Sequence, residues 1–149
     1  MEIYQILKKE HTEVNELIEE QLESRSSGSN ENILPKISSE LYAHMEGEEK
    51  TLYPRLEKVD ESRGQVLESY EEHHVAKGVL RELAKMPIEE EHWKAKLSVM
   101  KELIQHHIEE EENSLFKTAK QVLDKKEAQE IGEKYLVEKK RIMERSKRK

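Results

Sequence analysis

Histidine and glutamate occupy positions of this 149-residue chain where the helical pattern calls for an apolar side chain. Over four long segments, apolar residues recur every three or four positions, which is typical of amphipathic helices. Each stripe contains one histidine in place of an apolar residue, and two stripes also contain a glutamate. The six residues are His11, His44, Glu48, His73, His107 and Glu111. Buried unpaired imidazoles and ionised carboxylates are costly, so something must satisfy the six together.

A metal centre would satisfy them, because it supplies positive charge where the carboxylates converge. Imidazole and carboxylate together suit iron, manganese and zinc, and affinity alone does not choose among these metals. The chain has no cysteine, which excludes disulfides, zinc–thiolate sites and thiol catalysis. It also lacks a glycine-rich phosphate loop and a nucleotide fingerprint. We therefore expect two metal ions, with Glu48 and Glu111 bridging them.

An internal repeat supports two ions rather than one. HMEGEEKTLY, which starts at His44, matches HIEEEENSLF, which starts at His107. EHTEVNELI, which starts at Glu10, matches EHHVAKGVL, which starts at Glu72. The repeat predicts two helix pairs related by a pseudo-twofold axis. Each ion would then take one histidine from the first or third segment and one from the second or fourth.

Five helical segments must position these residues. The apolar spacing predicts helices over about 3–23, 32–59, 61–85 and 89–123, with SRSSGSN at 24–30 as the clearest linker. Asp124 is a plausible N-cap for a fifth helix, with Glu127 three residues on. Short connections favour antiparallel neighbours. We expect an all-α, up-down-up-down antiparallel four-helix bundle over residues 1–123, with an additional C-terminal helix over 124–149 packed on the same domain.

Composition excludes several classes of function. The formal net charge of -7 argues against general nucleic-acid binding. The basic end KKRIMERSKRK is expected to be a solvated helix terminus, with contact to an acidic partner as the alternative. The C-terminal helix is also the candidate surface for a protein partner or a homo-oligomer. No run approaches the ~18 apolar residues of a membrane span, and no signal peptide is recognisable. We expect a cytoplasmic protein.

Two of the predicted ligands have an adjacent histidine. The apolar stripe of the third segment selects His73 over His74, because neighbouring helical residues point about 100° apart. The repeat selects His107 over His106. His74 stays open as an additional ligand, as a hydrogen-bonding neighbour or as a surface residue. His106 is expected to flank the site.

Other residues beside the ligands also have two interpretations. Glu49 and Glu112 follow the two carboxylates, and they are either part of a solvated face or acceptors that orient a ligating histidine. Tyr53 and Phe116 stand at matched positions of the repeat, and we expect them to fill the core, with a redox group as the alternative. Gly47 costs about 1 kcal/mol relative to alanine inside a helix. It would allow a neighbouring helix to approach closely or leave an opening for a ligand.

These elements resemble the hemerythrin-like, or HHE cation-binding, family. The likeness covers nearly the whole chain and rests on EHTEV, HMEGEEKTLYP, EEHHVAKGVL and HHIEEEENSLF. It implies a non-haem di-iron centre inside a four-helix bundle, whose members bind oxygen or respond to oxygen, nitric oxide, peroxide or iron. The ligands it implies are His11, His44, Glu48, His73, His107 and Glu111.

The chain departs from oxygen-carrying hemerythrins in two places. Carriers have a His-x-x-x-His pair on the third helix, whereas Lys77 stands four residues after His73. They also have His-x-x-x-x-Asp on the fourth helix, where this chain has His107-x-x-x-Glu111. We therefore expect a protein with two iron ions, or manganese or zinc instead, that binds or senses oxygen, nitric oxide or peroxide. The alternatives are a peroxide-consuming oxidoreductase and an iron-handling protein, and the residues do not decide whether the protein is an enzyme.

Overall fold

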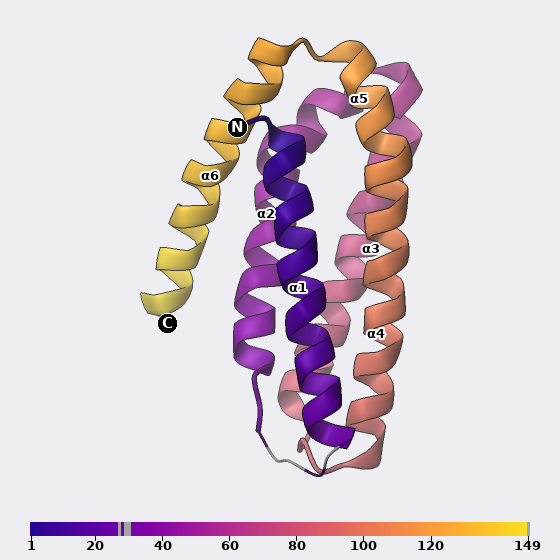
Figure 1. Cartoon of the computed structure of the whole chain (residues 1–149), viewed down its shortest axis with the longest axis vertical. Coiled ribbons are helices and arrows are strands. Elements are labelled where there is room, and N and C mark those ends of the chain that lie inside the picture. The colour runs from indigo at the N-terminus through magenta and orange to yellow at the C-terminus, as the bar shows by residue number, and fades with distance from the viewer. Residues whose placement is uncertain (27, 29–30, 149) are drawn as a thin grey trace.

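The computed structural model describes residues 1–26, 28 and 31–148. These form α1 (Ile3–Ser26), α2 (Leu34–Glu57), α3 (Asp60–Lys85), α4 (Glu91–Glu110), the π-helical η1 (Glu111–Leu115), α5 (Phe116–Val122) and α6 (Lys125–Arg148). Helices α1 to α4 form an antiparallel bundle, and α6 runs back along its outside beside α2 and α1 (Figure 1). The predicted all-α bundle with an extra C-terminal helix is confirmed. Among the described helices, none has a stretch both long and apolar enough to cross a membrane.

The connection between α1 and α2 starts later than the predicted linker. Residues 24–26 form the last turn of α1, while residues 27, 29 and 30 of that linker lie outside the described part of the chain. The buried side chain of Gln21 holds the far end of the connection. Its Nε2 donates to the Glu31 carbonyl oxygen at 2.9 Å, and its Oε1 accepts from the Ile33 amide at 2.6 Å. These bonds fix where the chain turns into α2.

The fourth predicted segment is interrupted by a π turn instead of forming one regular helix. The turn begins at Glu111, and the Phe116 amide donates to the Glu111 carbonyl oxygen five residues earlier. Because a π turn holds an extra residue, residues five apart can face the same side. Glu111 and Phe116 are both buried, at 1% exposure each. The turn therefore places a predicted ligand and a core aromatic on one face.

Helix α6 begins at the predicted cap and packs closely against α2. The Asp124 carboxylate accepts the Glu127 amide at 2.8 Å, which confirms the N-cap. Farther along, the ring of Tyr135 lies directly over Gly47 of α2, where a Cβ atom would come within 2.5 Å of the ring. Gly47 therefore serves the close approach of a helix, the first of its two predicted roles.

Two clusters of buried apolar side chains fill the bundle, one on each side of a polar layer. One cluster includes Leu7 of α1 and Leu52 of α2, and the other includes Val14 of α1 and Met45 of α2. His11 lies between the two clusters on α1, and Glu48 lies between them on α2, while His44 directly precedes Met45. The polar layer is therefore closed off at both ends by packed hydrocarbon.

Candidate metal centre

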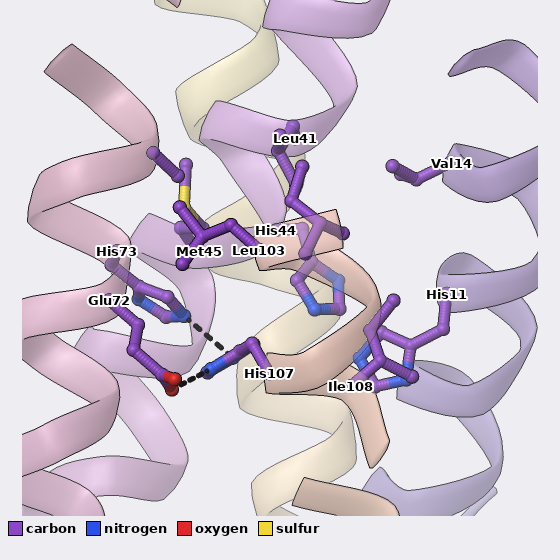
Figure 2. Close-up of a pocket in the computed structure, with 12 residues that line it drawn as sticks. His11, Val14, Leu41, His44, Met45, Glu72, His73, Leu103, His107 and Ile108 are labelled. Atoms are coloured by element: carbon purple, nitrogen blue, oxygen red, sulfur yellow. Dashed lines mark hydrogen bonds and ion pairs between the residues drawn. The ribbon is translucent and has the colours of Figure 1, made fainter. Parts of the chain in front are cut away.

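The structure brings all six predicted residues together in the polar layer. None is more than 8% exposed, and the four histidine rings turn toward one shared space (Figure 2). They form two overlapping groups, in each of which one ligand atom per residue lies within 4.8 Å of the others. The first group is His11, His44, Glu48 and Glu111, and the second is Glu48, His73 and His107. That these residues bind metal stays a prediction, but their placement suits two neighbouring ions.

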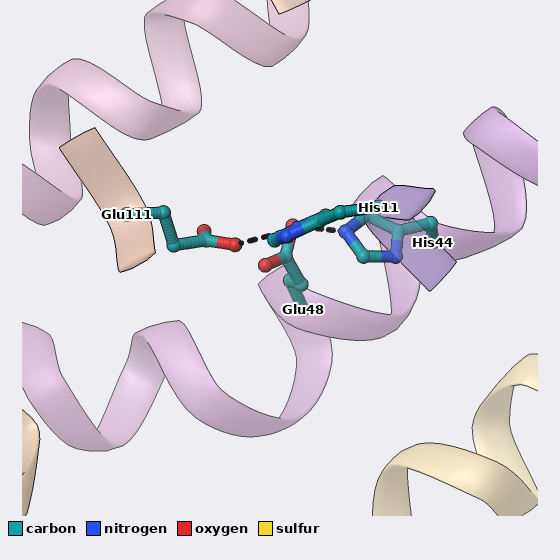
Figure 3. Close-up of side chains that lie close together, drawn as sticks. All are labelled: His11, His44, Glu48 and Glu111. Atoms are coloured by element: carbon teal, nitrogen blue, oxygen red, sulfur yellow. Dashed lines mark ion pairs between the residues drawn. The ribbon is translucent and has the colours of Figure 1, made fainter. Parts of the chain in front are cut away.

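The two carboxylates lie between the histidine pairs. Glu48 Oε1 is 3.3 Å from His44 Nε2 and 3.3 Å from His73 Nε2. Glu111 directs Oε1 to His11 Nε2 at 3.1 Å, while its Oε2 lies 3.6 Å from His107 Nε2. Figure 3 shows both carboxylates beside the rings of His11 and His44. Each glutamate therefore touches one histidine of each pair, as a bridging ligand must.

Every one of these histidines donates its Nδ1 proton to a glutamate on a neighbouring helix. The pairs are His11 with Glu112 (2.6 Å), His44 with Glu10 (2.8 Å), His73 with Glu49 (2.8 Å) and His107 with Glu72 (2.7 Å). In a neutral imidazole, donation from Nδ1 leaves the lone pair on Nε2, the atom that faces the centre. The bonds run from α2 to α1, from α1 to η1, from α4 to α3 and from α3 to α2. We call this closed circuit the histidine–glutamate ring.

Five buried atoms at the centre have no hydrogen-bond partner among the described residues. They are His11 Nε2, His44 Nε2, both carboxylate oxygens of Glu48 and Glu111 Oε1. A buried polar atom without a partner costs roughly 1–3 kcal/mol. The five atoms are good donors for iron, manganese or zinc. The residues present therefore fit a pair of metal ions, and binding would relieve this cost.

The charges of the centre compensate one another before any metal binds. Burial acts to lower the pKa of His44, but Glu48 and Glu10 outweigh it and raise that pKa to about 10. His73 behaves in the same way, since the nearby Glu48 carboxylate and the hydrogen bond to Glu49 outweigh burial and raise its pKa to about 9. Burial would raise the pKa of Glu48, yet the charge of the neighbouring His44 holds it well below 4.5. Metal ions would thus replace protons on the histidines.

Tyr53 does more than fill the core. It is fully buried, its hydroxyl donates to Glu111 Oε2 at 2.5 Å, and its oxygen lies 3.4 Å from His73 Nε2. Burial and the nearby carboxylates raise the pKa of Tyr53, so the hydroxyl keeps its proton. Phe116, at the matched position of the repeat, has no hydroxyl. The two halves of the centre are therefore chemically unequal.

The structure also places the residues beside the ligands. His74 is exposed, and His106 is 62% exposed and pairs with Glu110 on the surface. Neither lies in the two buried groups. Glu49 and Glu112 are acceptors in the histidine–glutamate ring, the functional one of their two predicted roles.

The other two acceptors of the ring, Glu10 and Glu72, were not predicted from the sequence. The repeat carried a signal for them, because each directly precedes a predicted histidine ligand. However, each accepts from a histidine on a different helix, so only the packing of the bundle identifies their role.

A small cavity adjoins the four histidine rings. Its volume is about 20 Å³, and its lining is mostly aliphatic (Figure 2). The aliphatic lining includes Val14, Leu41, Met45, Ala76 and Ile104. A space of this size holds a molecule about as large as one water. The cavity can therefore receive water, a diatomic gas or a similarly small molecule.

Comparison with known proteins agrees with the geometry. The family model of the hemerythrin HHE cation binding domain matches residues 2–119. A protein named DNA nickase from Nostoc sp. (strain PCC 7120) is 24% identical over 145 residues, which cover 97% of this chain but only 41% of that protein. No solved structure matches the chain. With most of its length matched and the buried histidine and glutamate groups in place, the chain belongs to the hemerythrin HHE cation-binding family.

Proposed function

We propose that this protein holds a dinuclear non-haem iron centre that binds oxygen, nitric oxide or peroxide. The observation that carries the proposal is the set of five buried ligand atoms, from His11, His44, Glu48 and Glu111, that have no hydrogen-bond partner among the described residues. One ion would be held by His11 and His44, the other by His73 and His107, and Glu48 and Glu111 would be shared. Iron is preferred because zinc has no redox chemistry and because the resemblance to hemerythrin-like proteins implies iron.

The bound ions would supply open coordination positions, because each has few protein ligands, and iron can also change its oxidation state. The protein would supply the orientation of the ligands and the limited access to the ions. The histidine–glutamate ring fixes the four imidazoles in the orientation and tautomer that a metal needs. The aliphatic cavity limits what reaches the ions to about the size of a water molecule. This combination favours binding or sensing of a small molecule.

Peroxide consumption is the second candidate, and Tyr53 favours it. A hydroxyl that keeps its proton and bonds to a predicted ligand is a proton donor at the centre. Steady release of oxygen from hydrogen peroxide by the iron-loaded protein would distinguish turnover from binding alone. A Tyr53→Phe variant copies the phenylalanine of the matched half and should slow this turnover while keeping the iron.

We do not propose the activity in the name of the Nostoc protein for this chain. This chain spans only 41% of that protein, and the rest of that protein has no counterpart here. The predicted ligands here are buried, and the cavity beside them is about 20 Å³. A DNA phosphodiester is larger than this cavity.

Elemental analysis of adjacent histidine variants tests the proposal. The wild-type protein, loaded with ferrous iron without oxygen, should retain about two irons per chain. It should gain a near-ultraviolet or visible charge-transfer band on exposure to air. His73→Ala should lose iron and change the band. His74→Ala removes an exposed neighbouring histidine and should behave like the wild type.

Two results would contradict the proposal. One is a wild-type protein that retains no iron and is equally stable with and without it. The other is equal iron content in His73→Ala and His74→Ala, because iron would then not be bound at the buried centre.

A further inference from the structure

Helix α6 reaches the centre although it lies outside the matched family region of residues 2–119. Tyr135 is fully buried, and its hydroxyl donates to Oε1 of Glu10. The same oxygen accepts the Nδ1 proton of His44 at 2.8 Å. Lys139, one turn farther along α6, donates to the other oxygen of Glu10 at 2.7 Å. Both oxygens of this acceptor are therefore held by α6.

The matched pair of the repeat, His107 and Glu72, has no support from α6 among the described residues. Glu72, which accepts from His107 as Glu10 accepts from His44, has a 19% exposed side chain, against 10% for Glu10. Glu72 accepts from His107 and lies close to the exposed residues His106 and Glu110, and no described residue of α6 bonds to it. The two pairs occupy equivalent places in the repeat, so the difference between them comes from α6.

The contact between α6 and α2 brings Tyr135 close to His44. The Tyr135 ring lies over Gly47, where any side chain would collide with it. The ring stands edge-on to the His44 ring, with centroids 6.2 Å apart. The Tyr135 oxygen is also 3.2 Å from His44 Nδ1. Tyr135 therefore closes the outer side of the His44 and Glu10 pair, while Lys139 balances the buried negative charge.

We propose that Tyr135 and Lys139 are positioning residues for one of the two metal ions. They fix Glu10, Glu10 fixes the orientation of His44, and the ion held by His11 and His44 therefore depends on α6. The ion held by His73 and His107 does not. The inference rests on the proposed function only in requiring metal at the centre. It makes the two ions unequal in affinity and couples the docking of α6 to the loading of one of them.

Metal titration of Tyr135→Phe in the full chain tests the inference. Cobalt(II) serves as the probe, because its visible spectrum reports each equivalent bound. Removing a hydrogen-bond partner of a metal-ligating histidine typically costs 10–100-fold in affinity. Because Tyr135 acts on His44 through Glu10, we expect one equivalent to weaken by about the lower end of this range, roughly tenfold, and the other to keep its wild-type affinity. Lys139→Met should weaken the same equivalent.

Lys77→Met is the matched control on the other half. Lys77 donates to Glu49 at 3.3 Å, and Glu49 is the acceptor of His73. This variant should weaken the equivalent that Tyr135→Phe leaves unchanged. Combining Tyr135→Phe with His44→Ala should add little to the loss from His44→Ala alone, because both act on the same ion.

The outcomes separate this inference from the proposed function. A wild-type protein that binds no cobalt and no iron would overturn both. A wild-type protein that binds two ions, with Tyr135→Phe binding both at unchanged affinity, would overturn the inference alone. Equal weakening of both equivalents would also overturn it, because α6 would then act as a general support of the fold.

Discussion

Metal ions bound as proposed would compete with protons for the same histidine nitrogens in this centre. Each Nδ1 is committed to a glutamate of the histidine–glutamate ring, so only Nε2 is available to either. In the metal-free protein, protonated His44 and His73 neutralise the buried carboxylates around them. A metal ion must displace these protons, so loading should release protons and strengthen as pH rises.

The metal-free protein should lose stability on the alkaline side. The pKa of His44 is raised from 6.5 to about 10 and that of His73 from 6.5 to about 9. A raised pKa contributes stability fully below 6.5, and this contribution is lost as pH rises through the folded values. The Glu10 pKa is lowered from 4.5 to about 2, because its bonds to His44, Lys139 and Tyr135 outweigh burial. Its contribution is therefore lost as pH falls from 4.5 toward 2.

Thermal melting in chelator across this pH range is the measurement. The melting temperature should be highest between about pH 4.5 and 6.5 and should fall steadily toward pH 10. Protein loaded with metal should show a much smaller alkaline decrease, because its histidines are already deprotonated. A melting temperature of the metal-free protein that is flat or rising from pH 6.5 to 10 would be inconsistent with the buried ion pairs.

At the level of single residues, the sequence revealed the ligand candidates better than their supports. A histidine such as His11 breaks an apolar stripe, and such a break is visible within one helix. Glu10 lies beside it among many other glutamates, and its partner His44 is on another helix. Its role therefore depends on how the helices pack. The same is true of Tyr135, whose contact with Glu10 spans 125 residues of chain.

At the level of the helices, the contact between α2 and α6 shows a residue of poor helix propensity kept because the packing requires it. Gly47 costs about 1 kcal/mol within α2 relative to alanine. The space above it is filled by the fully buried ring of Tyr135. A rigid ring held on all sides cannot move aside as the end of a flexible side chain can.

Replacing Gly47 with alanine should therefore destabilise the protein despite the better helix propensity. Overpacking a core typically costs about 1–3 kcal/mol, against the gain of about 1 kcal/mol from propensity. Gly64→Ala, at an exposed position of α3, is the control, because nothing lies within 4 Å of the added Cβ and only the gain remains. Urea denaturation should show the two substitutions changing the free energy of unfolding in opposite directions. Equal stabilisation by both would mean that Tyr135 moves away freely.

The π turn is an element that the sequence did not predict. His107, Glu111 and Leu115 are spaced by four, as in a regular helix. The extra residue is therefore invisible in the apolar spacing, and it appears only in the hydrogen bond from Phe116 to Glu111. Helix ends were closer to expectation, because caps such as Asp124 have a local chemical signature.

On the scale of the whole molecule, the polar layer separates two apolar clusters that each span the bundle. The layer brings ionisable groups into the middle of the fold, where they would weaken it if left uncompensated. The overall stability should therefore depend on what occupies the layer.

Removing the metal should lower the melting temperature of the entire chain. A ligand at about a hundred times its dissociation constant stabilises the folded state by about 2.7 kcal/mol. At about 2–4 °C per kcal/mol for a chain of this size, chelation should lower the melting temperature by about 5–10 °C. Differential scanning calorimetry with and without chelator measures this, and His74→Ala should show the same difference. No change on chelation would place any bound metal outside the bundle's centre.

The closed histidine–glutamate ring also governs how the bundle opens. Every helix of the bundle gives one bond to a neighbour and receives one from another. No helix can leave without breaking two interfaces at once, so fraying that starts at either end should stop at this level. The backbone amides beside the centre should then exchange with solvent hydrogen together, in a single cooperative event, and not helix by helix.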